Sequence, residues 1–80
     1  MDNPIKAMRL ARGLNRKELA ASLETSYAQI ASAEGGNPRE IPLRWERGLR
    51  ALGIDYHQLN EQYRQWRIAT LAVAASPRQS

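Results

Sequence analysis

Residues 14–36 read LNRKELAASLETSYAQIASAEGG and contain two short helical patterns separated by a tight break. Each pattern begins at a residue whose side chain can cap a helix, Asn15 for the first and Ser26 for the second. Apolar residues follow at helical spacing, and Gly35-Gly36 supplies the left-handed residue on which helices commonly end. Two helices so close in sequence must cross steeply, which requires a small residue such as Ala20 at their contact. The stretch therefore predicts a helix-turn-helix whose second helix is presented outward.

Several short blocks follow one another between residues 5 and 59. They are Met8 to Leu14 (MRLARGL), Asn15, Arg16-Lys17, Glu18-Leu19-Ala20, Ser26 to Glu34, Ala51-Leu52-Gly53-Ile54 and Asp55 to Leu59. In content and order they resemble the Cro/lambda-repressor-like family of prokaryotic helix-turn-helix domains, also called the xenobiotic-response-element family. The resemblance implies an all-α fold, a compact five-helix lambda-repressor-like domain that binds double-stranded DNA. In this chain the fifth helix would be extended at the C-terminus.

The turn between the two motif helices departs from the family pattern. Family members usually have Gly and then Val there, with one residue at positive φ, whereas this chain has Glu24-Thr25. A residue other than glycine is disfavoured in that conformation by about 1 kcal/mol or more, so we expect a turn that is strained or differently shaped. The family also commonly has Gln, which touches a phosphate, at the position of Arg16. A guanidinium can make a stronger, charge-assisted contact there.

Length and composition are those of one small domain. The 80 residues can bury only about 60% of their unfolded surface, which leaves room for one modest core and no sizeable catalytic cleft. The sequence has no cysteine, one histidine (His57) and no glycine-rich phosphate-binding motif. We therefore expect no enzyme activity, no catalytic residue, no cofactor and no metal site. A polar start and the lack of a long apolar run favour a soluble, cytoplasmic, nucleoid-associated protein outside the membrane.

The distribution of charge favours a nucleic-acid partner more than the formal net charge of +4 does. Residues 6–17 contain lysine and arginine but no acidic residue. Alone, such a stretch is more often a solvated helix face, but beside a helix-turn-helix it favours contact with DNA phosphates. Helix N-termini add free N–H groups and a positive dipole end. The predicted phosphate contacts are Lys6, Arg12, Asn15, Arg16, Lys17, Ser26, Arg39 and Arg44.

Arg9 has a different predicted role. By resemblance, an Arg at this place in the first helix forms a structural ion pair with the Glu that ends the second motif helix, here Glu34. If the pair is partly buried, removing one partner costs about 3–5 kcal/mol, and if it is exposed, under about 1 kcal/mol.

Base recognition is expected from the second motif helix. By resemblance, its base-contacting residues are Tyr27, Ala28, Gln29 and Ser32, with Ala31 nearby. Gln29 has the amide that can recognise adenine, the alanines can touch a thymine methyl, and this face has no Arg or Lys to bind guanine. We therefore expect modest direct readout, supplemented by DNA shape or by a doubled site. The alternative is that Tyr27 only packs at the helix end.

Beyond the motif, the sequence predicts a loop and one further core helix. Gly35 to Glu40 is rich in turn formers, and Pro42 can stand in the first turn of the next helix. Trp45 begins an inward stripe that ends before Gly53, and we expect it to fill the core. The predicted core comprises Ile5, Met8, Leu14, Leu19, Leu23, Ile30, Trp45, Leu49 and Leu52.

A helical pattern continues past the point where the family domain usually ends. Asp55 with Gln58 can form a capping box, and apolar side chains then recur every three or four residues until Ser76-Pro77. We expect a DNA-binding domain over 1–59, a helical extension over 60–75 and a tail over 76–80.

The extension has three interpretations. It can form a homodimer contact through Tyr63, Trp66, Thr70 and Val73, or it can fold back over its own core. In the third, the chain is the amino-terminal part of a longer protein and its tail begins a linker.

Two functions from different classes remain. The first is a sequence-specific DNA-binding transcriptional regulator, a repressor of phage, plasmid or mobile-element type. It would bind an approximately palindromic operator as a homodimer, with its recognition helices about 34 Å apart. The second is a protein-interaction module that keeps the fold but docks a protein partner on the small face of Ala28, Ala31 and Ser32. The basic cluster favours the first function, and the alanine-rich face favours the second.

Overall fold

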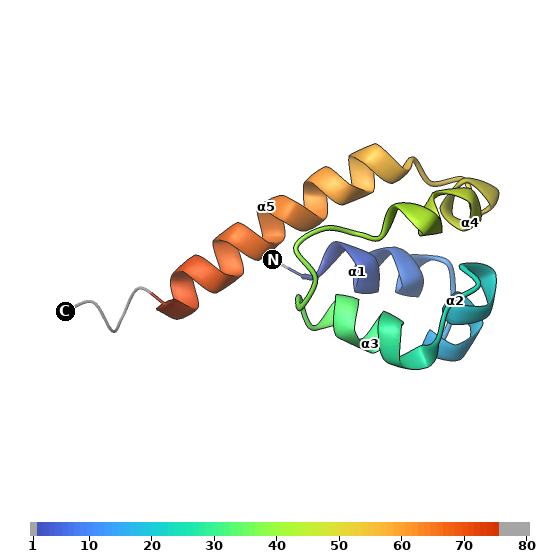
Figure 1. Cartoon of the computed structure of the whole chain (residues 1–80), viewed down its shortest axis with the longest axis horizontal. Coiled ribbons are helices and arrows are strands. Elements are labelled where there is room, and N and C mark those ends of the chain that lie inside the picture. Colours follow the sequence, from blue (N-terminus) through green and yellow to red (C-terminus); the bar gives the residue numbers. More distant parts are fainter. Residues whose placement is uncertain (1, 76–80) are drawn as a thin grey trace.

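Five α-helices follow one another along the chain, and the last is much the longest (Figure 1). The computed structural model describes residues 2–75, with side chains as far as Thr70, and no strand occurs within that range. The helices are α1 (Pro4–Ala11), α2 (Arg16–Ser22), α3 (Tyr27–Glu34), α4 (Glu46–Ala51) and α5 (Tyr56–Ala75), and a 3-10 turn, η1 (Leu43–Trp45), precedes α4. The predicted all-α fold with five helices is confirmed, while the predicted tail 76–80 lies outside the described residues.

Side-chain caps begin the helices where the sequence predicted them. Asn15 and Glu18 form a reciprocal capping box at α2, with both hydrogen bonds at 2.8 Å. Ser26 Oγ accepts from the backbone N–H of the third residue of α3, and an Asp55 carboxylate oxygen does the same at α5. Asn3, which was not predicted, caps α1 in front of Pro4.

The turn between α2 and α3 has the strain that the sequence predicted. Glu24 adopts a φ of 54°, the one positive φ among the non-glycine residues that the structure describes. Gly36, with a φ of 84°, follows the C-terminal end of α3, as expected for a glycine at that position. The chain thus turns from α2 into α3 at the cost of an unfavourable residue in that turn.

One hydrophobic core joins all five helices. Most predicted core residues are buried, and Met8, Leu14 and Leu52 are half-buried against them. Pro42 precedes the 3-10 turn instead of standing in the first turn of a helix, because the chain enters α4 through that turn. The buried apolar residues are Ile5, Leu19, Ala20, Leu23, Ile30, Ala33, Ile41, Trp45, Leu49, Tyr56, Leu59, Tyr63 and Trp66.

Side chains of α5 form hydrogen bonds to the backbone of the loop that follows α3. Tyr56 Oη donates to Ile41 O and Tyr63 Oη donates to Pro38 O, both at 2.6 Å. Asn60 Oδ1 accepts from the N–H of Ile41 at 2.8 Å, and one turn beyond Tyr63 a guanidinium donates to a carbonyl at 2.7 Å, Arg67 Nε to Gly36 O. Burial raises the pKa of both tyrosine hydroxyls, so they remain donors to higher pH than free tyrosine. These four residues of α5 fix the path of the loop.

The predicted dimer contact is wrong for its two aromatic residues. Tyr63 is fully buried and Trp66 is 8% exposed, both within one chain, and their rings stack with centroids 5.9 Å apart. The Trp66 ring lies so close to Gly36 that a Cβ there would come within 2.9 Å of it. The alternative, that α5 folds over its own core, holds as far as Trp66. Thr70 is exposed, and the side chain of Val73 lies outside those described.

The C-terminal part of α5 leaves the globule and projects away from the other helices (Figure 1). The molecule is accordingly elongated, with extents of 46 × 22 × 21 Å. Ile68 on this projecting part is 61% exposed.

The burial of Trp66 predicts that Trp66→Ala lowers the free energy of unfolding by about 3–5 kcal/mol, because it removes a large core side chain. Urea unfolding followed by circular dichroism measures this. Ile68→Ala, on the exposed part of the same helix, is the control and should change stability by less than about 0.5 kcal/mol. An unfolding midpoint that depends on protein concentration, and loses that dependence in Trp66→Ala, would contradict an intramolecular role.

The strained turn predicts that Glu24→Gly stabilises the protein by about 0.5–1 kcal/mol, since glycine adopts positive φ without the steric cost. A rise of a few degrees in the thermal midpoint would follow. Ala7→Gly, on the exposed side of α1, should have the opposite effect, about 0.5–1 kcal/mol of destabilisation. Equal losses in both variants would show that the turn is not strained.

Candidate nucleic-acid interface

The carboxylate of Glu34, the last residue of α3, accepts hydrogen bonds from two arginine side chains. Its side chain is 2% exposed, and it accepts from Arg9 Nε at 2.7 Å and from Arg9 Nη2 at 3.3 Å. Arg9 Nη1 donates to Leu14 O at 2.9 Å. The predicted ion pair between Arg9 and Glu34 is therefore present, and it is buried. A buried carboxylate is tolerable only because a forked guanidinium both neutralises it and satisfies its hydrogen bonds.

A second contact between α1 and α3 runs through Asn3. Its Nδ2 donates to Ala33 O and Glu34 O, each at 3.1 Å, while its Oδ1 caps α1. These bonds satisfy carbonyls at the end of α3 that have no partner within the helix. Sequence reasoning did not assign a role to Asn3, although an Asn directly before Pro is a typical helix start. Together, Asn3 and Arg9 lock α3 against α1 and leave its N-terminal turn free.

Arg16 has partners within its own chain, which its predicted role as a phosphate contact did not include. Its Nε donates to Glu34 Oε1 at 3.2 Å, and its Cζ lies 5.9 Å from the centroid of the Tyr27 ring. The side chain is 36% exposed. Interaction with the Tyr27 side chain, and then with Glu34, raises the pKa of the Arg16 guanidinium, so it stays charged at every pH at which the protein is studied. Arg16 thus links the start of α2 to both ends of α3.

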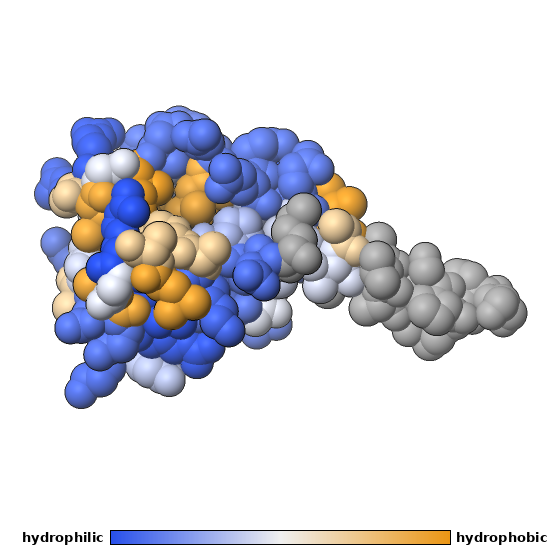
Figure 2. Space-filling model, turned by 180° about the vertical axis from the view of Figure 1, so that it is seen from behind, coloured by the Kyte–Doolittle hydropathy of each residue, from blue (hydrophilic) through white to orange (hydrophobic). Residues whose placement is uncertain are grey.

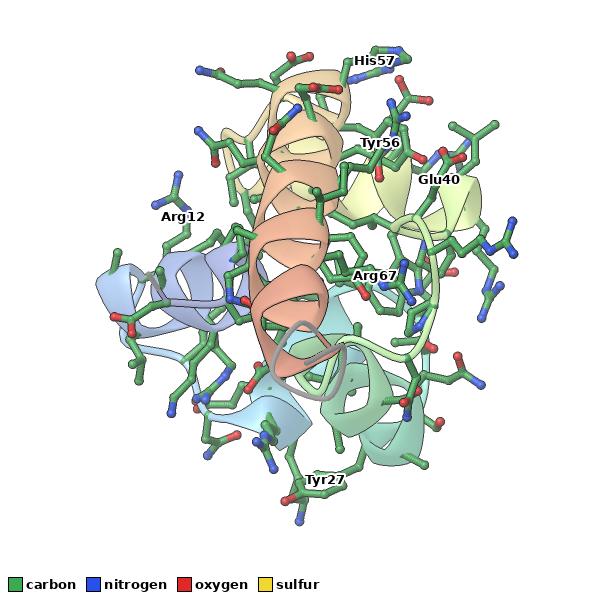
Figure 3. All side chains as sticks on the ribbon, turned by 90° about the vertical axis from the view of Figure 1, so that its left-hand side faces the viewer. Arg12, Tyr27, Glu40, Tyr56, His57 and Arg67 are labelled. Carbon is green, nitrogen blue, oxygen red and sulfur yellow. The ribbon has the colours of Figure 1, made fainter. Side chains whose placement is uncertain are left out.

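The first turn of α3 is the exposed part of that helix. Tyr27 is 52% exposed, and Ala28 and Gln29 are exposed beside it. Figure 3 shows Tyr27 at the opposite side of the molecule from His57, which marks the start of α5. Ser32 is half-buried, and its Oγ accepts from Asn37 Nδ2 at 3.3 Å. Of the predicted base-contacting residues, three therefore lie together on an open turn, and the fourth, Ser32, is half-buried and hydrogen-bonded to the loop after α3.

The predicted phosphate contacts divide into free and engaged groups. Arg12 Nε donates to Leu52 O at 3.0 Å, which fixes the end of α4. The side-chain oxygens of Asn15 and Ser26 are occupied as helix caps. The exposed cations without a hydrogen bond or ion pair within residues 2–75 include Lys6, Lys17, Arg39 and Arg44.

A hollow of about 420 Å³ lies between the C-terminal end of α2 and α4. Arg44 and Arg47 line it together with Glu24, and α4 packs so closely there that a Cβ on Gly48 would lie 2.6 Å from Ser22 O. The charged side chains that line the hollow are of both signs, and its lining residues do not include histidine. Nowhere in the described part of the chain do three His, Asp or Glu side chains gather as metal ligands would.

Apolar side chains form a separate surface feature. Seen from behind, they gather mainly at the end of the molecule away from the projecting part of α5 (Figure 2). On α1, Ala7, Leu10 and Ala11 are exposed, Leu10 to 59%. Their spacing puts them on one helix face. None of the described helices is long and apolar enough to cross a bilayer.

Comparisons of this chain with protein-family models, curated proteins and solved structures gave no match.

The burial of Glu34 predicts that Glu34→Gln lowers the free energy of unfolding by about 3–5 kcal/mol, because the Arg9 guanidinium, whose side chain is 10% exposed, loses its counter-charge. Chemical unfolding at neutral pH measures the change. Glu46→Gln is the matched control, since its partner Arg50 is 76% exposed, and it should cost under about 1 kcal/mol. Similar small losses in the two variants would show that the pair does not hold α1 and α3 together.

Proposed function

We propose that this protein is a sequence-specific DNA-binding transcriptional regulator of the Cro/lambda-repressor-like kind, acting as a repressor. The observation that carries the proposal is the arrangement of α3. Its C-terminal end is locked to α1 and α2 through Glu34, while its first turn, with Tyr27, Ala28 and Gln29, stands exposed. A rigidly held helix with an open N-terminal turn is what a reader of the major groove requires.

The surrounding charge supplies non-specific affinity in this proposal. Lys17 lies in the first turn of α2, where the helix dipole and free N–H groups also favour an anionic oxygen. Lys6 lies in the first turn of α1, and Arg39 lies in the loop after α3. These three exposed cations would contact phosphates and orient the protein on the duplex without selecting a sequence.

Base selection would come from a few weak contacts. The Gln29 amide can pair with adenine, and the methyl group of Ala28 can touch the methyl group of thymine. The exposed turn has no guanidinium of its own, so the common fork onto guanine is missing. Specificity would therefore depend also on DNA shape and on two half-sites read by a homodimer.

The homodimer in this proposal would use the part of α5 beyond Trp66. Ile68 is 61% exposed there and Thr70 is exposed, whereas Tyr63 and Trp66 belong to the core. Sedimentation at tens of micromolar protein, with and without a duplex of two half-sites, would report the oligomeric state.

The second candidate is a protein-interaction module. The exposed apolar face of Ala7, Leu10 and Ala11 on α1 favours it, because exposed apolar side chains grouped on one face are common at protein contacts. In that case the helix-turn-helix would be a scaffold.

Selection from a random pool of duplexes at physiological salt tests the proposal. We expect an approximately palindromic winner that is bound about a thousandfold more tightly than a scrambled duplex. No enrichment, with only weak and steeply salt-dependent binding, would contradict the regulator and direct the search to a protein partner.

Lys17→Ala should weaken binding to every duplex to a similar degree, because the ammonium contacts a phosphate and not a base. The slope of log K against log salt should flatten by about one unit. Arg50→Ala, which removes an exposed cation paired with Glu46 on α4, is the control and should leave the slope unchanged. Titration by fluorescence anisotropy at several salt concentrations measures both, and equal slopes in the two variants would exclude Lys17 as a phosphate contact.

A further inference from the structure

We propose that Arg16 is a positioning residue for Tyr27, so that it sets the sequence preference of α3 and does not act as a phosphate contact. This inference rests on the proposed DNA-binding function. The position of Arg16 within the basic stretch 6–17 does not by itself indicate this role.

The guanidinium of Arg16 is bound to a buried partner. Its Nε donates to Glu34 Oε1 at 3.2 Å, and that carboxylate is itself held by Arg9 through bonds of 2.7 and 3.3 Å. Because the Glu34 side chain is only 2% exposed, it cannot follow Arg16 outward. A phosphate that drew Arg16 away would leave the buried carboxylate with a single cationic partner.

Tyr27 lies at the surface, where few contacts restrict the rotamer of its side chain. It is the first residue of α3 and is 52% exposed. The Arg16 Cζ lies 5.9 Å from its ring centroid, a distance at which a guanidinium attracts an aromatic face. Since an exposed tyrosine otherwise samples several rotamers, this contact selects one of them. The positive charge of Arg16 thus orients the Tyr27 ring at the place where base edges would lie.

The two roles predict different results in DNA binding. If Arg16 acts through Tyr27, Arg16→Gln and Tyr27→Ala should relax preference at the same base pair. Each should weaken binding to the selected duplex by about tenfold, and the double variant should be no weaker than Tyr27→Ala alone. The salt slope should stay at the wild-type value in Arg16→Gln. Lys17→Ala removes the neighbouring cation, which makes no ion pair within the described residues, and it should change the slope and keep the preference.

Arg16→Lys separates charge from geometry. It keeps the positive charge but loses the planar group that can bind the carboxylate and stack on the ring together. A positioning role predicts the same altered base preference as in Arg16→Gln. A phosphate contact predicts nearly wild-type binding. Circular dichroism of each variant verifies that it is folded before binding is compared.

An NMR measurement on the free protein tests the contact without DNA. The Arg16 Nε–H resonance should shift in Tyr27→Ala, because the ring current of the tyrosine is removed, and it should change little in Gln29→Ala. An unmoved resonance, or additive losses with a flattened salt slope in Arg16→Gln, would overturn the inference while leaving DNA binding intact. Failure of the wild-type protein to select any duplex would instead remove the proposed function, and with it the basis for the positioning role.

Discussion

A single buried carboxylate determines how the N-terminal half of this protein is assembled. Glu34 accepts from Arg9 and Arg16, so one group joins the end of α3 to the last turn of α1 and the start of α2. Desolvation makes an unpaired charge at this place very costly, and the three helices must therefore keep their relative positions for the carboxylate to be satisfied. The orientation of α3, on which any function of its first turn depends, follows from that requirement.

Helix α5 provides the corresponding constraint for the C-terminal half. Its buried aromatic residues complete the core, and its polar side chains bind the backbone of the loop that follows α3. Because Tyr63 and Trp66 pack beside residues that were already predicted to be inward, α5 belongs to the same folding unit as α1 to α4. The expected separation into a domain over 1–59 and an extension over 60–75 therefore does not describe the packing as far as Trp66.

Sequence patterns were informative where the cause is local. Caps at Asn15 and Ser26 and the strain at Glu24 depend on neighbours within a few residues, and the structure agrees at each. The prediction that Arg9 pairs with Glu34 was based on a family resemblance, because no spacing rule relates residues so far apart in the sequence. What could not be predicted depends on tertiary contacts: the bonds of Asn3 to α3, the second partner of Glu34 in Arg16, and the direction in which Trp66 faces. An amphipathic helix shows which face is apolar but not which chain covers it.

The contacts of α5 with the loop have a consequence for how this surface can vary. The side-chain hydrogen bonds of Tyr56, Tyr63 and Arg67 within the described residues go to main-chain carbonyls, which every residue type possesses. Apart from Glu40, which accepts from Asn60 Nδ2 at 3.3 Å, exposed side chains of the loop such as Arg39 therefore have little influence on its path. Substitutions there can alter the charge presented to a partner while the backbone keeps its course. The same backbone path can therefore carry different charges on this surface.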